Sequence, residues 1–209
     1  MTARWHGFYF ITDSGLSVNG IVADVSEALR AGVAMVQYRE KLKAYADCCE
    51  EAREVQRRCR EAGVPFIVND NVELARELGA DGVHVGQEDM PAGEARSRLG
   101  PGAIIGVSVG SAEEARAAES QGASYVAVSP LFDTPTKTDA GPGLGLATLR
   151  QIRAAATLPI AAIGGLNAAN IPAAIQAGAD LICAISASLA GGAVHDNIRR
   201  LMAADKSSQ

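Results

Sequence analysis

The chain has 209 residues, of which 48% are hydrophobic and 21% are charged, and this composition excludes a disordered, collagen-like or coiled-coil protein. A chain of this length is expected to form one domain, which we take as residues 1–209. The formal net charge of −5 argues against nucleic acid as a partner, although it does not exclude a local cationic cleft.

Eight short apolar segments are expected to be β-strands, because each is nearly continuous in hydrophobic residues. In chain order they are residues 8–12, 33–38, 65–69, 81–85, 103–109, 125–129, 159–163 and 181–185. Five of them follow a glycine that ends a helical pattern and is expected to form a left-handed cap: Gly32, Gly63, Gly79, Gly122 and Gly178. Strands this apolar are usually covered on both faces, which predicts a parallel sheet.

Helical patterns alternate with these strands. They cover residues 21–31, 44–62, 72–78, 92–99, 112–121, 146–156, 168–177 and 194–203. Eight strand–helix units with right-handed crossovers predict a (β/α)8 TIM barrel of small size. The alternative, an open doubly wound sheet, lacks a G-x-G-x-x-G turn after the first strand. We also expect a short extra helix beside the last strand and a disordered tail at 204–209.

The remaining sequence features indicate a cytoplasmic protein that neither spans nor binds a membrane. The four cysteines lack the paired spacing of zinc ligands, and Cys48 and Cys59 fall on one apolar helical face, so we expect free, buried thiols. Residues 154–179 carry no charged side chain, but their prolines, glycines and asparagines predict a strand, a turn and a helix. No secretory signal is expected. The oligomeric state stays open, with a homo-oligomer among the alternatives.

In a TIM barrel the functional residues gather at the C-terminal ends of the strands. Gln37, Arg39 and Lys41 follow the second strand, where alternation points all three in one direction, as in an anion clamp. Asp70 and Asp89 follow the third and fourth strands. Two carboxylates beside a phosphate clamp are a usual arrangement for Mg²⁺, whereas helix capping is the alternative interpretation of each alone.

A second, neutral anion site is predicted at the ends of the last two strands, where Gly165 offers a bare amide and Ser186 a hydroxyl beside a helix start. The strand-5 end offers the hydroxyl of Ser108. His84 is interpreted as a base, a ring-orienting donor or a core histidine, with no choice among them.

The longest loop, residues 129–145, is rich in glycine and proline and carries Thr134, Thr136 and Lys137. Loops of this length in compact domains are usually binding loops or lids, with a flexible spacer as the alternative.

Together these motifs resemble the family of thiamine-phosphate synthase and its relative, thiazole tautomerase. The residues that carry the resemblance are 37–41, Asn69-Asp70, 84–89, 106–108, 134–137, 163–165 and Ile185-Ser186. The resemblance implies a (β/α)8 transferase of thiamine biosynthesis. Such an enzyme joins 4-amino-2-methyl-5-hydroxymethylpyrimidine diphosphate to a thiazole phosphate and releases diphosphate.

The resemblance also implies roles for individual residues. The pyrimidine diphosphate would be bound by Gln37, Tyr38, Arg39, Glu40, Lys41, Asn69, Ser108 and Lys137. Arg39, Lys41 and Lys137 would be the catalytic cations. The thiazole phosphate would be bound by Thr134, Pro135, Thr136, Gly165, Ile185 and Ser186. Asp70 and Asp89 would hold Mg²⁺.

The expected reaction is a dissociative substitution that needs no side-chain nucleophile, because an electron-rich aminopyrimidine stabilises positive charge on its exocyclic methylene. The protein would neutralise the departing diphosphate and align the attacking thiazole nitrogen. Two alternatives are a tautomerase and a non-catalytic barrel that binds phosphate ligands. The tautomerase branch carries a histidine after the strand-5 serine-valine pair, where this chain has Gly110. A further departure is Tyr38, which stands where the family pattern has an aliphatic residue.

Overall fold

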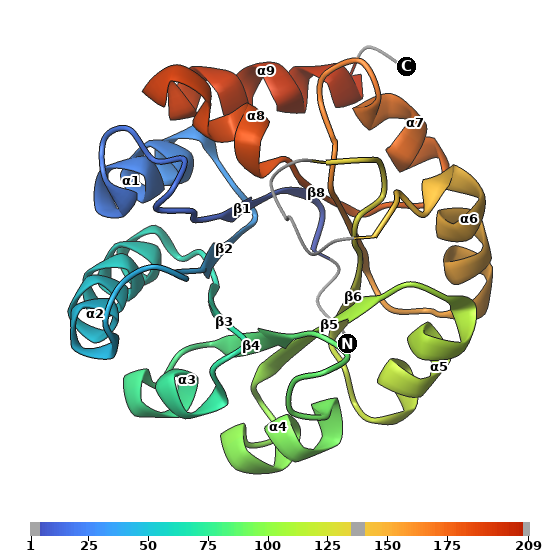
Figure 1. Cartoon of the computed structure of the whole chain (residues 1–209), viewed down its shortest axis with the longest axis horizontal. Coiled ribbons are helices and arrows are strands. Elements are labelled where there is room, and N and C mark those ends of the chain that lie inside the picture. Colours follow the sequence, from blue (N-terminus) through green and yellow to red (C-terminus); the bar gives the residue numbers. More distant parts are fainter. Residues whose placement is uncertain (1–4, 135–140, 207–209) are drawn as a thin grey trace.

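The computed structural model describes residues 5–134 and 141–206, which form a closed barrel of parallel strands surrounded by helices (Figure 1). The strands are β1 (Gly7–Ile11), β2 (Met35–Tyr38), β3 (Phe66–Asn69), β4 (Gly82–Val85), β5 (Ile104–Val109), β6 (Tyr125–Val128), β7 (Ile160–Ile163) and β8 (Leu181–Cys183). Each strand pairs in parallel with the next, and β8 closes the barrel on β1. The (β/α)8 prediction is therefore confirmed.

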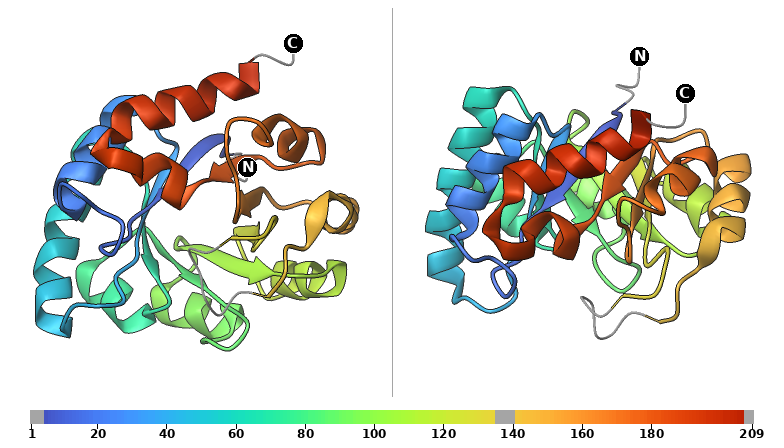
Figure 2. Two further views of the ribbon diagram at one scale, coloured as in Figure 1. Left: turned by 45° about the horizontal axis from the view of Figure 1, so that its top comes forward. Right: turned by 90° about the horizontal axis from the view of Figure 1, so that it is seen from above.

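Helices cover the outer face of the barrel. They are α1 (Ile21–Ala31), α2 (Tyr45–Ala62), α3 (Val72–Leu78), α4 (Ala92–Leu99), α5 (Ala112–Ser120), α6 (Gly145–Ala155), α7 (Ile171–Gln176), α8 (Ile185–Leu189) and α9 (Val194–Lys206), with a 3-10 turn at Ala190–Gly192. Figure 2 shows α9 lying along the outside of the barrel beside α1, so the last helix packs against the first.

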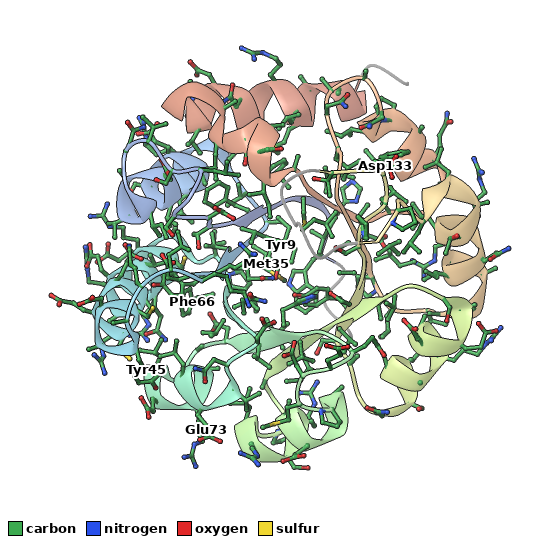
Figure 3. All side chains as sticks on the ribbon, viewed as in Figure 1. Tyr9, Met35, Tyr45, Phe66, Glu73 and Asp133 are labelled. Atoms are coloured by element: carbon green, nitrogen blue, oxygen red, sulfur yellow. The ribbon has the colours of Figure 1, made fainter. Side chains whose placement is uncertain are left out.

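Two apolar layers hold the barrel together. The larger one lies between strands and helices, and the smaller one fills the barrel interior. Tyr9 and Met35 belong to the interior layer and lie near the centre of the ring in Figure 3, whereas Phe66 belongs to the outer layer, on the side of α2. Each side chain of this size contributes roughly 1.5–3 kcal/mol when fully buried. The interior is thus a packed core that closes one end of the site above it.

The boundaries differ from the predictions where a strand meets a turn. The strand predicted at 181–185 ends at Cys183, because Ile185 begins α8, the expected extra helix. α7 begins at Ile171, three residues later than predicted, after a turn in which Asn170 N donates to Asn167 O. α9 continues to Lys206, past the start of the expected disordered tail, and residues 207–209 lie outside the described residues.

The predicted glycine caps are present. Gly32, Gly63 and Gly79 end their helices in the left-handed conformation, and Gly122 and Gly178 also have positive φ, one residue beyond their caps. All four cysteines are buried and free. No helix of segments 5–134 and 141–206 is long and apolar enough to cross a membrane.

Candidate active site

A cavity of about 910 Å³ opens at the C-terminal ends of the strands. Residues from all eight strands or the loops that follow them line it, and its volume suits a small-molecule ligand. Most of the predicted site residues meet here: Gln37, Arg39, Lys41, Asn69, Asp70, Asp89, Ser108, Thr134, Gly165, Ile185 and Ser186. Three others, Pro135, Thr136 and Lys137, lie outside the described residues.

The cationic side of the cavity is built on the end of β2. Thr12 locks the backbone of Arg39, since its hydroxyl accepts from Arg39 N at 2.8 Å and donates to Arg39 O at 2.9 Å. The guanidinium then meets Asp13, with Nη1 2.7 Å from Oδ2. Lys41 forms a second ion pair, with Nζ 2.7 Å from Asp70 Oδ2. The sequence interpretation missed Thr12 and Asp13, although both directly follow β1 and the end of that strand was an available signal.

Tyr38 and Glu40 point away from the cavity, which corrects their assignment to the pyrimidine diphosphate site. Alternation along β2 sends Tyr38 outward, where it is 2% exposed and donates from its hydroxyl to Glu51 at 3.0 Å. Glu40 shapes the loop instead, because its Oε1 accepts from Leu42 N at 2.6 Å and from Ser14 Oγ at 2.8 Å. Burial opposes ionisation of Glu40, but these hydrogen bonds hold its pKa below the usual value.

The carboxylate side consists of Asp70 and Asp89, at the ends of β3 and β4. Asp70 has a φ of 58° and is the only non-glycine residue of the described segments with positive φ. Such a conformation costs on the order of 1–3 kcal/mol, and a hydrogen bond of 2.8 Å from Asp70 N to His84 O helps to hold it. Asp89 Oδ2 accepts from Gly86 N at 2.8 Å. Strain at the residue that offers a carboxylate to the cavity is typical of a functional position.

Neither carboxylate belongs to a complete metal cage. Among the residues that the structure describes, no group of three or more His, Cys, Asp or Glu side chains is arranged to hold a metal ion. Asp70 and Asp89 nevertheless line the same cavity and offer hard oxygen ligands. Mg²⁺ is usually bound by one or two carboxylates together with water and substrate phosphate oxygens. Asp70 and Asp89 therefore fit a Mg²⁺ ion that the protein and its substrate would coordinate together.

A hydrogen-bonded chain crosses the barrel interior beneath the cavity, and we call it the interior chain. It runs through Gln37, Tyr9, Tyr125, His84 and Ser108, with contacts of 2.7, 2.7, 3.0 and 3.0 Å in that order. Burial raises the pKa of both phenols well above the usual value, so both are neutral. The sequence interpretation missed Tyr9 and Tyr125, whose signal was a tyrosine at an inward position of an apolar strand.

The opposite wall is formed by the loops after β6, β7 and β8. Backbone hydrogen bonds join the first two of these loops, with Leu131 N 2.7 Å from Ile163 O and Phe132 N 3.1 Å from Gly164 O. Gly165 has a φ of 64°, and a Cβ there would lie 2.6 Å from Asp133 O. The glycine is therefore required by its positive φ and by the close approach of the β6 loop.

A (β/α)8 barrel with cations and carboxylates on one side of its mouth and glycine amides and hydroxyls on the other defines a class of enzymes that act on small phosphorylated molecules. The comparisons narrow this class. The family described as thiamine monophosphate synthase matches residues 8–188, and the chain belongs to that family.

Curated relatives and a solved structure agree with this membership. The thiamine-phosphate synthase of Methanosarcina barkeri is 49% identical over 86% of this chain and 81% of that protein. The thiamine-phosphate synthase of Methanosarcina mazei is 44% identical over 93% of this chain and 81% of that protein. The structure of the thiamine phosphate pyrophosphorylase from Pyrococcus furiosus has a TM-score of 0.88 and 35% identity, and the match covers 98% of this chain and 97% of that one.

Proposed function

We propose that this chain is a transferase that condenses 4-amino-2-methyl-5-hydroxymethylpyrimidine diphosphate with a thiazole phosphate to give thiamine phosphate and diphosphate. The observation that carries this proposal is the presence of two chemically different walls in one cavity. One wall has Arg39, Lys41, Asp70 and Asp89, and the other has Gly165 and the start of α8. Two phosphorylated substrates that react with each other need such a pair of walls.

The cationic wall is assigned to the pyrimidine diphosphate. Lys41 and Asp70 are paired with each other. A diphosphate with Mg²⁺ would replace this pair, because its oxygens suit the ammonium and its cation suits the carboxylate. Asn69 and Ser108 line the same part of the cavity and add an amide and a hydroxyl. Asp70 and Asp89 would hold Mg²⁺, which when bound would supply positive charge to the diphosphate.

The neutral wall is assigned to the thiazole phosphate. Thr134, Gly165, Ile185 and Ser186 line this side of the cavity. The resemblance adds Pro135 and Thr136 here, and it adds Lys137 to the diphosphate site. The backbone hydrogen bonds between the β6 and β7 loops hold this wall rigid, which keeps the thiazole nitrogen aligned with the reacting carbon.

The reaction needs no covalent intermediate with the protein. The bond between the methylene carbon and the diphosphate oxygen breaks with its electron pair on diphosphate, and the lone pair of the thiazole nitrogen forms the new carbon–nitrogen bond. Cys183 lies in the cavity wall, but burial raises the pKa of this thiol far above its usual value. A protonated thiol is a weak nucleophile, so Cys183 does not compete with the thiazole nitrogen.

An assay of diphosphate release tests the proposal against its two alternatives. The proposed transferase releases diphosphate when both substrates and Mg²⁺ are present. A tautomerase converts a thiazole phosphate isomer without any pyrimidine substrate, although Gly110 offers no proton-transfer group where that branch has histidine. A binding barrel gives no product from any combination, and either of these two results would refute the proposal.

We place the enzyme in the cytoplasm, with small molecules as its partners and without nucleic acid or membrane. Four free, buried thiols support a reducing compartment. The acidic net charge of −5 supports the exclusion of nucleic acid, because the cations of the cavity are local and paired with carboxylates.

A further inference from the structure

The hydrogen bonds of the interior chain can all donate in one direction or in the other. This direction determines whether Ser108, the last residue of the interior chain, offers a proton or only lone pairs to a ligand. We propose that the Gln37 amide, acting through Tyr9 and Tyr125, fixes His84 as a neutral imidazole with its proton on Nε2. Ser108 then accepts from His84 and keeps its own hydroxyl proton for the cavity. Tyr9, Tyr125 and His84 are positioning residues in this proposal, which rests on the proposed binding of diphosphate by Ser108.

The direction follows from counting protons along the chain. Gln37 Nε2 can only donate, so the Tyr9 oxygen accepts and its single proton goes to the Tyr125 oxygen. The Tyr125 proton then has one remaining partner in the chain, His84 Nδ1. An imidazole that accepts at Nδ1 carries its proton on Nε2, and this proton faces Ser108 Oγ at 3.0 Å.

The same count disfavours an imidazolium at His84. A proton on Nδ1 would have to donate to the Tyr125 oxygen, whose own proton would then face the proton of Tyr9. Neither phenol can relieve this conflict by ionising, because burial raises the pKa of both. The hydrogen-bond geometry of the interior chain therefore favours the neutral imidazole and selects one of its two tautomers.

Packing holds the interior chain in this geometry. The rings of His84 and Tyr125 stack, with centroids 5.6 Å apart and an interplanar angle of 27°. They meet across β5 because Gly106 leaves the space: a Cβ on it would lie 2.1 Å from Tyr125 Cζ and 2.5 Å from His84 Nδ1. Trp5 packs edge-on against Tyr125 from the N-terminal end of the barrel. The phenol is thus held from both sides.

The functional consequence lies at Ser108, which lines the cavity. With its proton free, the hydroxyl donates to a phosphate oxygen. If the chain ran in the opposite direction, Ser108 would donate to His84 and turn only lone pairs toward the ligand. Lone pairs repel an anion, so the direction of the chain decides between attraction and repulsion at this point.

Nitrogen-15 NMR of the histidine side chains tests the direction without reference to activity. The protein has three histidines, so the His84 signals can be identified with His6→Gln and His195→Gln variants. We expect the neutral tautomer with Nε2 protonated and Nδ1 unprotonated at pH 7. Observation of the Nδ1-protonated tautomer, or of an imidazolium at this pH, would overturn the proposal.

Gln37→Glu tests whether the direction is set from the far end of the chain. The introduced carboxylate only accepts, so every hydrogen bond should reverse and the His84 proton should move to Nδ1. The spectrum is recorded at a pH where the carbon-13 shift of the introduced carboxyl shows that it is ionised. An unchanged tautomer would refute the role of Gln37. Tyr38→Phe, which removes a phenol outside the barrel, is the matched control and should leave the tautomer unchanged.

Binding of inorganic diphosphate with Mg²⁺ tests the consequence for the ligand. We expect Ser108→Ala to weaken binding by about tenfold or more, the range for loss of one hydrogen bond to a charged group. Tyr125→Phe should weaken binding only while Ser108 is present, so the double variant should bind like Ser108→Ala alone. Full binding by Ser108→Ala, or additive losses in the double variant, would refute this consequence, and the tautomer measurement would still decide the direction.

Discussion

Lys41 and Asp70 form an ion pair at the rim of the cavity, with Nζ 2.7 Å from Oδ2. The pair joins a cation assigned to diphosphate to a carboxylate assigned to Mg²⁺. Their side chains are 52% and 31% exposed, and exposed pairs contribute about 0–1 kcal/mol to stability. The pair is therefore weak enough for substrate to exchange, and it neutralises both groups until substrate arrives.

Asp70→Asn should reduce kcat by about 10²–10³ while the protein stays folded, because one preorganised charge contact is lost. Asparagine tolerates the left-handed backbone, so the φ of 58° is retained and the loss reports the carboxylate alone. The measurement is kcat as a function of Mg²⁺ concentration. Asp47→Asn, an exposed carboxylate in α2, is the control and should behave as the wild type. Normal turnover by Asp70→Asn at saturating Mg²⁺ would exclude this carboxylate from metal binding.

Tyr38→Phe should leave the KM for the pyrimidine diphosphate unchanged, because the phenol lies outside the barrel and bonds Glu51. Loss of that hydrogen bond should lower the free energy of unfolding by about 1 kcal/mol. Steady-state kinetics and urea unfolding measure the two effects separately. A large rise in KM would restore Tyr38 to the substrate site.

Gly106→Ala should strongly destabilise the protein, since its Cβ would lie 2.1 Å from Tyr125 Cζ. Overpacking in a core typically lowers the free energy of unfolding by about 1–3 kcal/mol. Because this contact is so short, we expect a loss at or above the upper end of that range. Urea unfolding of Gly106→Ala and Gly102→Ala compares a glycine inside β5 with one in the turn that precedes this strand. A Cβ on Gly102 meets no atom within 4 Å, so that variant should unfold like the wild type. Equal stability of the two variants would contradict the packing described for the interior chain.

Asp24→Asn should stabilise the protein at neutral pH. Asp24 is 1% exposed and its Oδ1 has no hydrogen-bond partner in the structure. Burial raises the pKa of Asp24 above the ordinary 3.8. The hydrogen bond from Ser17 lowers this pKa, but by less than burial raises it. Because the pKa of Asp24 is higher in the folded state than in the unfolded state, this residue favours folding at pH values below its unfolded-state pKa. That contribution is lost as the pH rises through its folded-state pKa.

The test is the difference in unfolding free energy between Asp24→Asn and the wild type at several pH values. The advantage of the variant should grow from pH 4 to pH 7. Asp47→Asn, an exposed carboxylate in α2, controls for the loss of one negative charge. A difference that does not change with pH would show that Asp24 does not titrate in this range.

The sequence predicted those parts of the site that depend on local rules. Period-two alternation at the end of β2 placed Gln37, Arg39 and Lys41 on the cavity side, and the same rule shows why Tyr38 faces outward. Strand-end position was sufficient to find Asp70. The position of each of these residues in the cavity wall could be predicted because it depends on its own strand.

The features that the sequence did not reveal depend on strands that are distant along the chain. Tyr9 and Tyr125 are 116 residues apart and meet through closure of the barrel. Asp13 pairs with Arg39 across the junction of β1 and β2. The end of β8 was misjudged because Ile185 is apolar in either a strand or a helix, and its place is decided by the turn at Ala184.

We propose above that one cavity binds two phosphorylated substrates and joins them. The most direct test measures thiamine phosphate and diphosphate together in one reaction with wild-type enzyme, Mg²⁺ and both substrates. We expect one thiamine phosphate for each diphosphate, and neither product when either substrate is omitted. Diphosphate release without the thiazole phosphate, or the absence of thiamine phosphate when both substrates are present, would contradict it.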